Sequence, residues 1–555
     1  MKILFEEYAY ETTILEGILP RGYYHQATPL LSKIYYVGYY NNSPVSDKGE
    51  AVVILPKIFL SEDEKLFGVC SPEQLLSEPE IIWKRLKEAG RAEALYSFSI
   101  WIFRAIQNYV RRFPSNKTTE NQLYNQIINN TGDADHTELG LVLSLFRFFK
   151  DNRGLFTSVS KLQNAGRSKI NWTKTSIRTN PIIQGKNIIF TDFVSKHKTV
   201  NFDEELLVIF YSVLNYYKDA YGFSIILETN YELITGHRFQ WLLENGIRKL
   251  KSIKYKYFND RFVKLWSLLY TFFEKADKSR SGRQFEEVLL VKDFNLVFED
   301  MIDDLLSDDQ LPNFLKSHKD GKELDHIYKD TSLFPQDHIY FIGDSKYYKP
   351  GNAVGSTSIA KQFTYAKNVI QYNIDLFHQG KEANGIRYRD ELTEGYNISP
   401  NFFITAILDQ KFDFSRPGLN EDASEARFSY HFKNRLFDRD SLYVQHYDIN
   451  FLYVLSSYVS GSLSSKQKFK NSARGKFRLN LISYFNDHFV FTKVTPASDI
   501  TLLVDKYFKK LIGKMYRSSD WSNSIVVAQH KADVQDLSAV FSDETGITIT
   551  EFLLE

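Results

Sequence analysis

The chain has 555 residues, of which 43% are hydrophobic and 25% are charged, and its formal net charge is +1. This length exceeds what one hydrophobic core usually organises, so roughly two to four domains are expected. The 35 Tyr and 44 Phe residues favour packed structure over disorder. The single cysteine, Cys70, excludes a disulfide framework and a Cys-rich zinc module, and a small buried apolar position suits it better than a nucleophilic one.

The N-terminal segment does not have the pattern of a secretory signal, because Glu6 and Glu7 interrupt it too early. No window approaches the run of about eighteen apolar residues that a membrane-spanning helix needs. We therefore expect a cytoplasmic protein without a membrane partner. A net charge near zero neither requires nor excludes nucleic acid, because affinity for phosphate depends on where the basic residues lie.

The first seventy residues predict a β-rich module, with aromatic and aliphatic runs at 34–40 and 51–56 joined by polar turn residues. From about Ser77 the apolar residues follow a helical period. Residues 152–202 are rich in Asn, Ser, Thr and Lys, which suits loops or short strands. Helices are predicted at about 96–113, 119–131 and 136–151, and again between 202 and 273.

Two clusters combine basic with aromatic or aliphatic residues, a mixture that suits a surface following a phosphate backbone. A solvated helix face is the alternative for each of them. The first cluster contains Arg248, Lys249, Lys251 and Lys254. The second contains Lys466, Lys468, Lys470, Arg474, Lys476 and Arg478.

The polar segment 275–282 lacks bulky apolar residues and is the best linker candidate, so we place the main domain boundary there. The expected fold class is α/β and multi-domain, with a mixed β and helical N-terminal region before a mixed-sheet domain. The domains expected are a β-rich module at 1–70, a mainly helical recognition or partner-docking region at 71–281, a catalytic domain at 282–465 and a basic, helical extension at 466–555.

Beyond this boundary, residues 294–306 have the apolar spacing of an amphipathic helix. Glu299 lies beside the apolar stripe, where a carboxylate could reach a cleft, and a solvated acidic face is the alternative. That alternative is stronger for the neighbouring Asp300. A strand is then predicted after Asp325, followed by a turn and a second strand at 339–348.

The second predicted strand carries Asp344, Ser345 and Lys346. Hairpin pairing would bring Asp325 beside Asp344, and residues two apart on a strand face the same side. Two carboxylates, the Ser345 carbonyl and water would satisfy the oxygen preference of Mg²⁺. Lys346 could then orient or deprotonate a water molecule, or offset charge on a phosphorane. This combination is typical of phosphodiester hydrolysis.

A following helical segment, 358–370, presents Gln362 and Tyr365 on one face, three residues apart. The Gly-Lys dipeptides of the chain are each followed by a residue other than Ser or Thr, so there is no phosphate-binding P-loop. We therefore expect this chain to bind no nucleotide itself, and any nucleotide hydrolysis to come from a partner.

These residues resemble the PD-(D/E)xK nucleases, and within them the restriction-endonuclease subunits of the LlaJI and McrC type. The matching positions are Phe298–Glu299, Leu324–Asp325, Asp344-Ser345-Lys346, and Gln362 with Tyr365. Two departures are visible. Leu324 replaces the proline of the family, and the spacing from Gln362 to Tyr365 is three where related nucleases often use four.

The resemblance implies a restriction-endonuclease-like domain with Asp325 and Asp344 as ligands of Mg²⁺, for which Mn²⁺ could substitute. Glu299 and Ser345 would support the metal, Lys346 would be the catalytic lysine, and Gln362 and Tyr365 would position other groups. It also implies cleavage of double-stranded DNA in a restriction system against phage, activated by a separate GTP-using AAA+ NTPase. Whether the chain forms a homodimer is left open. The alternatives are a non-catalytic nucleic-acid-binding or assembly subunit and a repair or transposition nuclease.

Overall fold

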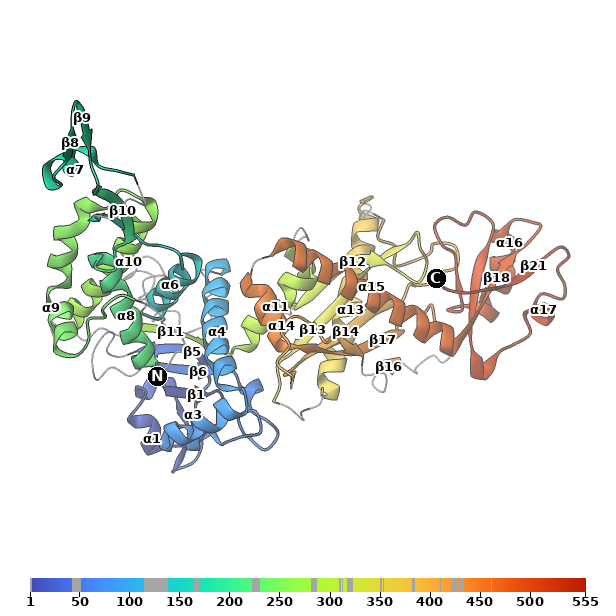
Figure 1. Cartoon of the computed structure of the whole chain (residues 1–555). Helices are drawn as coiled ribbons and strands as arrows, with labels where there is room; N and C mark the ends of the chain where they lie inside the picture. The colour runs from blue at the N-terminus through green and yellow to red at the C-terminus, as the bar shows by residue number, and fades with distance from the viewer. Residues whose placement is uncertain are drawn as a thin grey trace.

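A computed structural model describes the chain at residues 2–41, 51–113, 138–163, 169–221, 230–280, 287–308, 311, 313–316, 323–349, 352, 354–381, 385–409, 411–421, 427–428, 434–460 and 462–555. The predicted helix at 119–131 lies outside these residues. The described residues form two lobes, one N-terminal and one C-terminal, as Figure 1 shows. Together they contain α/β structure with several separate sheets.

The N-terminal lobe is built on a mixed four-stranded sheet with the order β1-β6-β5-β11. Its strands are β1 (Lys2–Phe5), β6 (Ala51–Leu55), β5 (Tyr36–Asn41) and β11 (Glu287–Lys292). β1 and β6 are parallel, whereas β5 runs antiparallel to both β6 and β11. A smaller antiparallel sheet contains β2 (Ala9–Glu11), β4 (Leu31–Lys33) and β3 (His25–Gln26).

Helices surround this sheet, and the long helix α4 contacts β5, β6 and β11. Its apolar residues Phe98, Ile102 and Ile106 are buried, which follows from their helical spacing. The helices of the lobe are α1 (Thr12–Glu16), α2 (Pro72–Ser77), α3 (Pro79–Glu88), α4 (Ala92–Arg112), α6 (Glu138–Asp151), α8 (Glu205–Tyr221), α9 (Gly236–Ile253) and α10 (Asp260–Arg280).

A projection of short elements extends from this lobe (Figure 1). It contains β7 (Ser158–Gln163), α7 (Trp172–Arg178), β8 (Ile182–Gln184), β9 (Asn187–Ile189) and β10 (Ser195–Val200). The short strands agree with the loop-rich prediction for 152–202.

The predicted linker at 275–282 differs from the structure over its first six residues, which continue helix α10 to Arg280. The segment is polar, but Lys275 is buried and its Nζ lies 2.6 Å from Glu287 Oε1 in β11. β11 in turn completes the N-terminal sheet beside β5. The N-terminal sheet therefore includes a strand from beyond the predicted boundary at 281/282, and a buried ion pair joins that strand to α10.

The C-terminal lobe contains a six-stranded mixed sheet in which β12, β13, β14, β17 and β15 follow in this order and β16 also pairs with β17. β12 and β13 are antiparallel, and β13, β14 and β17 are parallel. The strands are β12 (His326–Thr331), β13 (His338–Lys346), β14 (Ser399–Ile407), β15 (Asn420–Glu421), β16 (Arg427–Phe428) and β17 (Leu442–Asn450).

Helices cover both faces of this sheet, as alternate residues of β14 show. Phe403 packs with Ile359 and Phe363 of α13, whereas the Phe402 ring lies 4.8 Å from the Phe477 ring of α15. A Cβ on residue 343 would lie 2.2 Å from the Phe402 ring, so β13 needs glycine there. The helices are α11 (Asn295–Leu306), α12 (Asn313–Lys316), α13 (Ser356–His378), α14 (Phe451–Ser460) and α15 (Leu463–His488).

The C-terminal end of the chain forms an antiparallel sheet with the order β19-β20-β18-β21. Helix α15 packs on α11 and leads directly into β18, so it joins the two sheets of the lobe. The elements are β18 (Phe489–Thr495), α16 (Ile500–Leu511), β19 (Met515–Tyr516), β20 (Ile525–His530), α17 (Leu537–Val540) and β21 (Thr548–Phe552). Among the described helices, none has both the length and the apolar character needed to cross a bilayer.

Candidate active site

The predicted hairpin brings Asp325 to the end of β13. The antiparallel register pairs His326 with Gly343, and the Ser345 backbone N–H donates a hydrogen bond to Asp325 Oδ2 over 2.9 Å. Asp344 and Lys346 face the same side of β13, since the Lys346 ammonium forms an ion pair with the Asp344 carboxylate. The predicted strand pairing and the shared face of Asp344 and Lys346 are thus present in the structure, and the role of the three side chains as a metal site stays a prediction.

Helix α11 adds Glu299 to this group. Phe298, Met301 and Ile302 bury the apolar stripe of the helix, and Glu299 beside them is half-buried, not solvated. Its Oε1 accepts a hydrogen bond from Asn295 Nδ2 over 3.2 Å. The charge of Asp344 acts on this carboxylate, which places the two groups in one electrostatic environment.

Asp300, in contrast, is not on a solvated face, so the alternative preferred for it from the sequence is wrong. Its carboxylate is buried and accepts a hydrogen bond from the Tyr458 hydroxyl over 2.5 Å. Arg112 Nη1 lies 3.2 Å from the same oxygen. α4 and α14 pack over this side of α11, which makes Asp300 a structural group between the lobes.

Burial dominates the electrostatics of the carboxylates. Burial, together with the charges of Glu299 and Asp344, raises the pKa of Asp325 to about 7. It likewise raises the pKa of Glu299 to about 7, with Asp344 acting in the same direction and Asn295 and Lys346 opposing. Three carboxyl groups that repel one another in a partly dry site favour a bound cation.

The donor set fits a hard divalent cation, because carboxylate oxygens are the ligands that Mg²⁺ prefers. Within the described ranges, no group of three or more His, Cys, Asp or Glu side chains is arranged as a metal-binding cluster. Asp344 is instead paired with Lys346. The residues therefore fit a divalent cation in their charge and in the chemistry of their oxygen donors. Asp325 and Asp344 are the two carboxylates that the hairpin brings together.

Sequence reasoning missed a set of buried polar contacts under this site. His326 Nε2 lies 2.5 Å from Ser345 Oγ, and its Nδ1 lies 3.6 Å from Asp303 Oδ1. Burial alone would raise the pKa of the Asp303 carboxyl, but His326 and Lys316 hold it well below its usual range. The contact with His326 holds Ser345, the residue between Asp344 and Lys346. In the sequence, the only indication of this contact was the strand alternation, which turns residue 326 away from Asp325.

Gln362 and Tyr365 lie on the inward side of α13, as their spacing predicted. Gln362 is buried, and its Oε1 has no hydrogen-bond partner among the described residues. Tyr365 is half-buried against the core. Helix α13 contacts β13, the strand that carries Asp344 and Lys346. The positioning role of Gln362 and Tyr365 stays a prediction.

Most of the second basic cluster already has partners within the chain. Lys470 Nζ binds the Ser307 carbonyl over 2.6 Å, and Arg474 binds the Leu306 carbonyl and, over 2.7 Å, Asp308 Oδ1. These contacts satisfy the C-terminal carbonyls of α11. Lys466 contacts Asp304, and Lys476 contacts the Leu419 carbonyl. Arg478 contacts the Ser332 and Glu555 carbonyls, and Lys468 is exposed.

The first basic cluster lies on α9 and the turn that follows. Lys249 Nζ lies 2.6 Å from Glu205 Oε1, and Lys254 lies over the Trp266 ring at 4.6 Å. Lys251 is 5.9 Å from the centre of the Tyr270 ring, and Arg248 is exposed. A role of either cluster in DNA binding stays a prediction.

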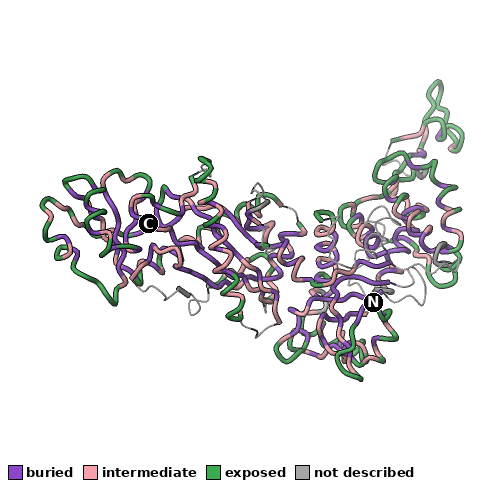
Figure 2. The backbone as a smooth tube through the Cα atoms, turned by 180° about the vertical axis from the view of Figure 1, so that it is seen from behind, coloured by how far each residue is buried: buried purple, intermediate pink, exposed green. Residues whose placement is uncertain are grey.

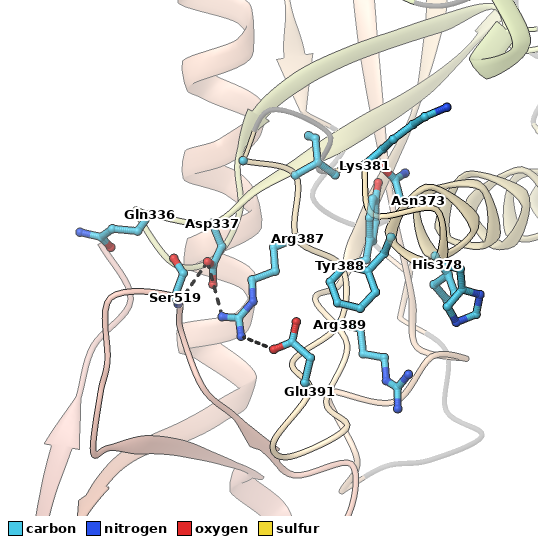
Figure 3. A pocket seen from close by; sticks show the side chains of 14 residues that line it. Gln336, Asp337, Asn373, His378, Lys381, Arg387, Tyr388, Arg389, Glu391 and Ser519 are labelled. Carbon is cyan, nitrogen blue, oxygen red and sulfur yellow. Dashed lines mark hydrogen bonds and ion pairs between the residues drawn. The ribbon is translucent and has the colours of Figure 1, made fainter.

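A separate cavity of about 400 Å³ lies at the C-terminal end of α13 (Figure 3). Arg387 forms ion pairs across it with Asp337 and Glu391, at 3.8 and 3.5 Å. None of the predicted site residues lines this cavity, so it is distinct from the carboxylate site.

Comparisons with known proteins leave the family open. No protein-family model and no curated protein matches the chain. A solved structure, the half-complex from a tetradecameric assembly of Thermococcus gammatolerans McrB AAA+ hexamers with bound McrC, matches 85% of this chain and 99% of the matched chain. The identity is 11% and the TM-score is 0.27, a likeness too distant to establish a shared fold.

The raised pKa values predict how stability changes with pH in the metal-free protein. Between about pH 4 and pH 7, folded Asp325 and Glu299 bind more protons than they do in the unfolded chain, so their contribution to stability falls as pH rises. The loss is on the order of a few kcal/mol. Asp325→Asn should raise the Tm above pH 7 in EDTA, whereas Asp330→Asn should not, and thermal unfolding across this pH range measures both. A Tm difference between Asp325→Asn and the wild type that does not grow from pH 4 to pH 7 would contradict the shifts.

Proposed function

We propose that this chain is a metal-dependent DNA endonuclease subunit with a PD-(D/E)xK active site. The observation that carries the proposal is the convergence of Asp325, Asp344 and Lys346 at the end of one hairpin, with Glu299 coupled to them electrostatically. The flanking of the mixed sheet by α11 and α13 supports it, because these helices bring Glu299 and Gln362 toward the same strand.

Asp325 and Asp344 would hold Mg²⁺ or Mn²⁺, with Glu299 and the Ser345 carbonyl in support. The metal, when bound, would polarise the scissile phosphate and lower the pKa of a water molecule. Lys346 would orient that water or offset the charge that develops on phosphorus, since its ammonium already contacts Asp344. The hydrogen bond from Ser345 to Asp325 keeps the two strands in register while these groups act.

We assign the chain to a restriction system that acts on foreign double-stranded DNA. The sequence lacks a P-loop, so nucleotide hydrolysis is assigned to a separate AAA+ NTPase that uses GTP and activates this subunit. The similarity of the motifs to LlaJI-type and McrC-type subunits supports this division of labour.

A plasmid-cleavage assay tests the proposal. Purified full-length protein is incubated with supercoiled DNA and Mg²⁺, with and without the NTPase encoded beside it and GTP, and EDTA is the control. Nicked or linear DNA that forms only with the metal is expected. Robust DNA binding with no cleavage under any of these conditions would instead favour a non-catalytic nucleic-acid-binding subunit.

A further inference from the structure

Residues 169–200, the part of the N-terminal projection that follows β7, include no residue of the candidate active site. This part stands away from the rest of the lobe, and Figure 2 colours most of it as exposed. Its own structure is small but defined. Thr175 of α7 is buried, and its hydroxyl accepts a hydrogen bond from the Val194 N–H over 3.0 Å.

The tip of the projection is a hairpin that is apolar on both faces. In β8 and β9, Ile182 pairs with Ile189 and Ile183 with Ile188, and the two pairs point to opposite sides. The four side chains are between 44% and 72% exposed. Gly185 has a φ of 65°, which a tight two-residue turn requires at its first position. The hairpin is therefore an isoleucine-covered ribbon that the described residues leave exposed.

The same projection is strongly basic in a chain of almost zero net charge. Residues 169–200 contain six Lys or Arg residues and one acidic residue, Asp192. Lys174, Arg178 and Lys186 are exposed, and their side chains have no ion-pair partner in the part of the chain that the structure describes. The two basic clusters predicted from the sequence differ from the projection in this respect, because most of their cations bind other groups of this chain.

We propose that the projection is a DNA-binding arm that places the β8–β9 hairpin in a groove of duplex DNA. The major groove, about 12 Å wide, admits a two-stranded β-ribbon, and apolar side chains contact thymine methyl groups there. Lys174, Arg178 and Lys186 would bind the phosphates on either side. The inference names the DNA-contacting element of the proposed nuclease and rests on that function only in taking DNA as the ligand.

Binding of full-length protein to a labelled duplex, measured by fluorescence anisotropy in EDTA over a series of NaCl concentrations, tests the arm. The triple variant Lys174→Ala, Arg178→Ala, Lys186→Ala should bind at least about tenfold more weakly, and the slope of log Kd against log salt should fall by about three. The matched control replaces three exposed lysines elsewhere with alanine, Lys84, Lys87 and Lys531, and should bind as the wild type does.

A second variant, Ile183→Ser with Ile188→Ser, removes one apolar face of the ribbon. It should weaken binding while the salt slope stays unchanged, because no phosphate contact is lost. Wild-type affinity in the triple variant would overturn the proposal. So would loss of NTPase association with normal DNA binding, which would make the arm a protein-docking element. Because cleavage is not measured, weakened binding in both variants would support the arm even if the nuclease assay failed.

Discussion

Replacing Asp344 with asparagine is expected to lower Mg²⁺-dependent DNA cleavage by about a thousandfold or more. The change keeps the shape of the side chain but removes the negative charge that pairs with Lys346 and acts on Glu299 and Asp325. It therefore removes a proposed metal ligand and releases the Lys346 ammonium at the same time. The initial rate of plasmid linearisation, measured with the proposed NTPase partner, gives the size of the effect.

Lys346→Ala should cause a loss of similar size, and the double variant should be no worse than the stronger single variant, because groups that act as a unit are not additive. Asp375→Asn, on the exposed side of α13, is the matched control and should retain full activity. Cooperative thermal unfolding and DNA binding should persist in all variants. Cleavage at the wild-type rate by Asp344→Asn would remove the proposed site from consideration.

The hairpin could be predicted because its information is local. A polar turn between two apolar runs fixes the register, and the register alone places Asp325 beside Asp344 and turns Lys346 to the same side. Helices α11 and α13 were likewise visible in their apolar spacing.

The surroundings of the site could not be predicted, because their partners are distant in sequence. Asp300 is buried by Tyr458, 158 residues later, and Arg112, 188 residues earlier. Lys470 and Arg474 have the composition of a nucleic-acid surface, but they bind the end of α11, more than 160 positions away. Composition reports charge, whereas only tertiary packing decides which charges remain available.

Tertiary packing also decides the environment of Lys275, for which the polar sequence predicted a linker. Lys275→Ala is expected to destabilise the N-terminal lobe by about 3–5 kcal/mol, the usual cost of leaving one member of a buried ion pair without its partner. Glu287 is 3% exposed, and its other oxygen accepts hydrogen bonds from the Glu138 N–H over 2.7 Å and the Tyr39 hydroxyl over 3.4 Å. The carboxylate is thus held in place and cannot turn to water.

Denaturant unfolding followed by the fluorescence of the tryptophans in the N-terminal lobe measures this loss of stability. Lys264→Ala, on the exposed side of the same helix, is the matched control. The control should change stability by less than about 0.5 kcal/mol. Lys275→Met combined with Glu287→Gln should recover much of the loss, because no charge then remains buried. If Lys275→Ala were as mild as the control, α10 and β11 would not be joined by this pair, and 275–282 would behave as the linker that its composition suggests.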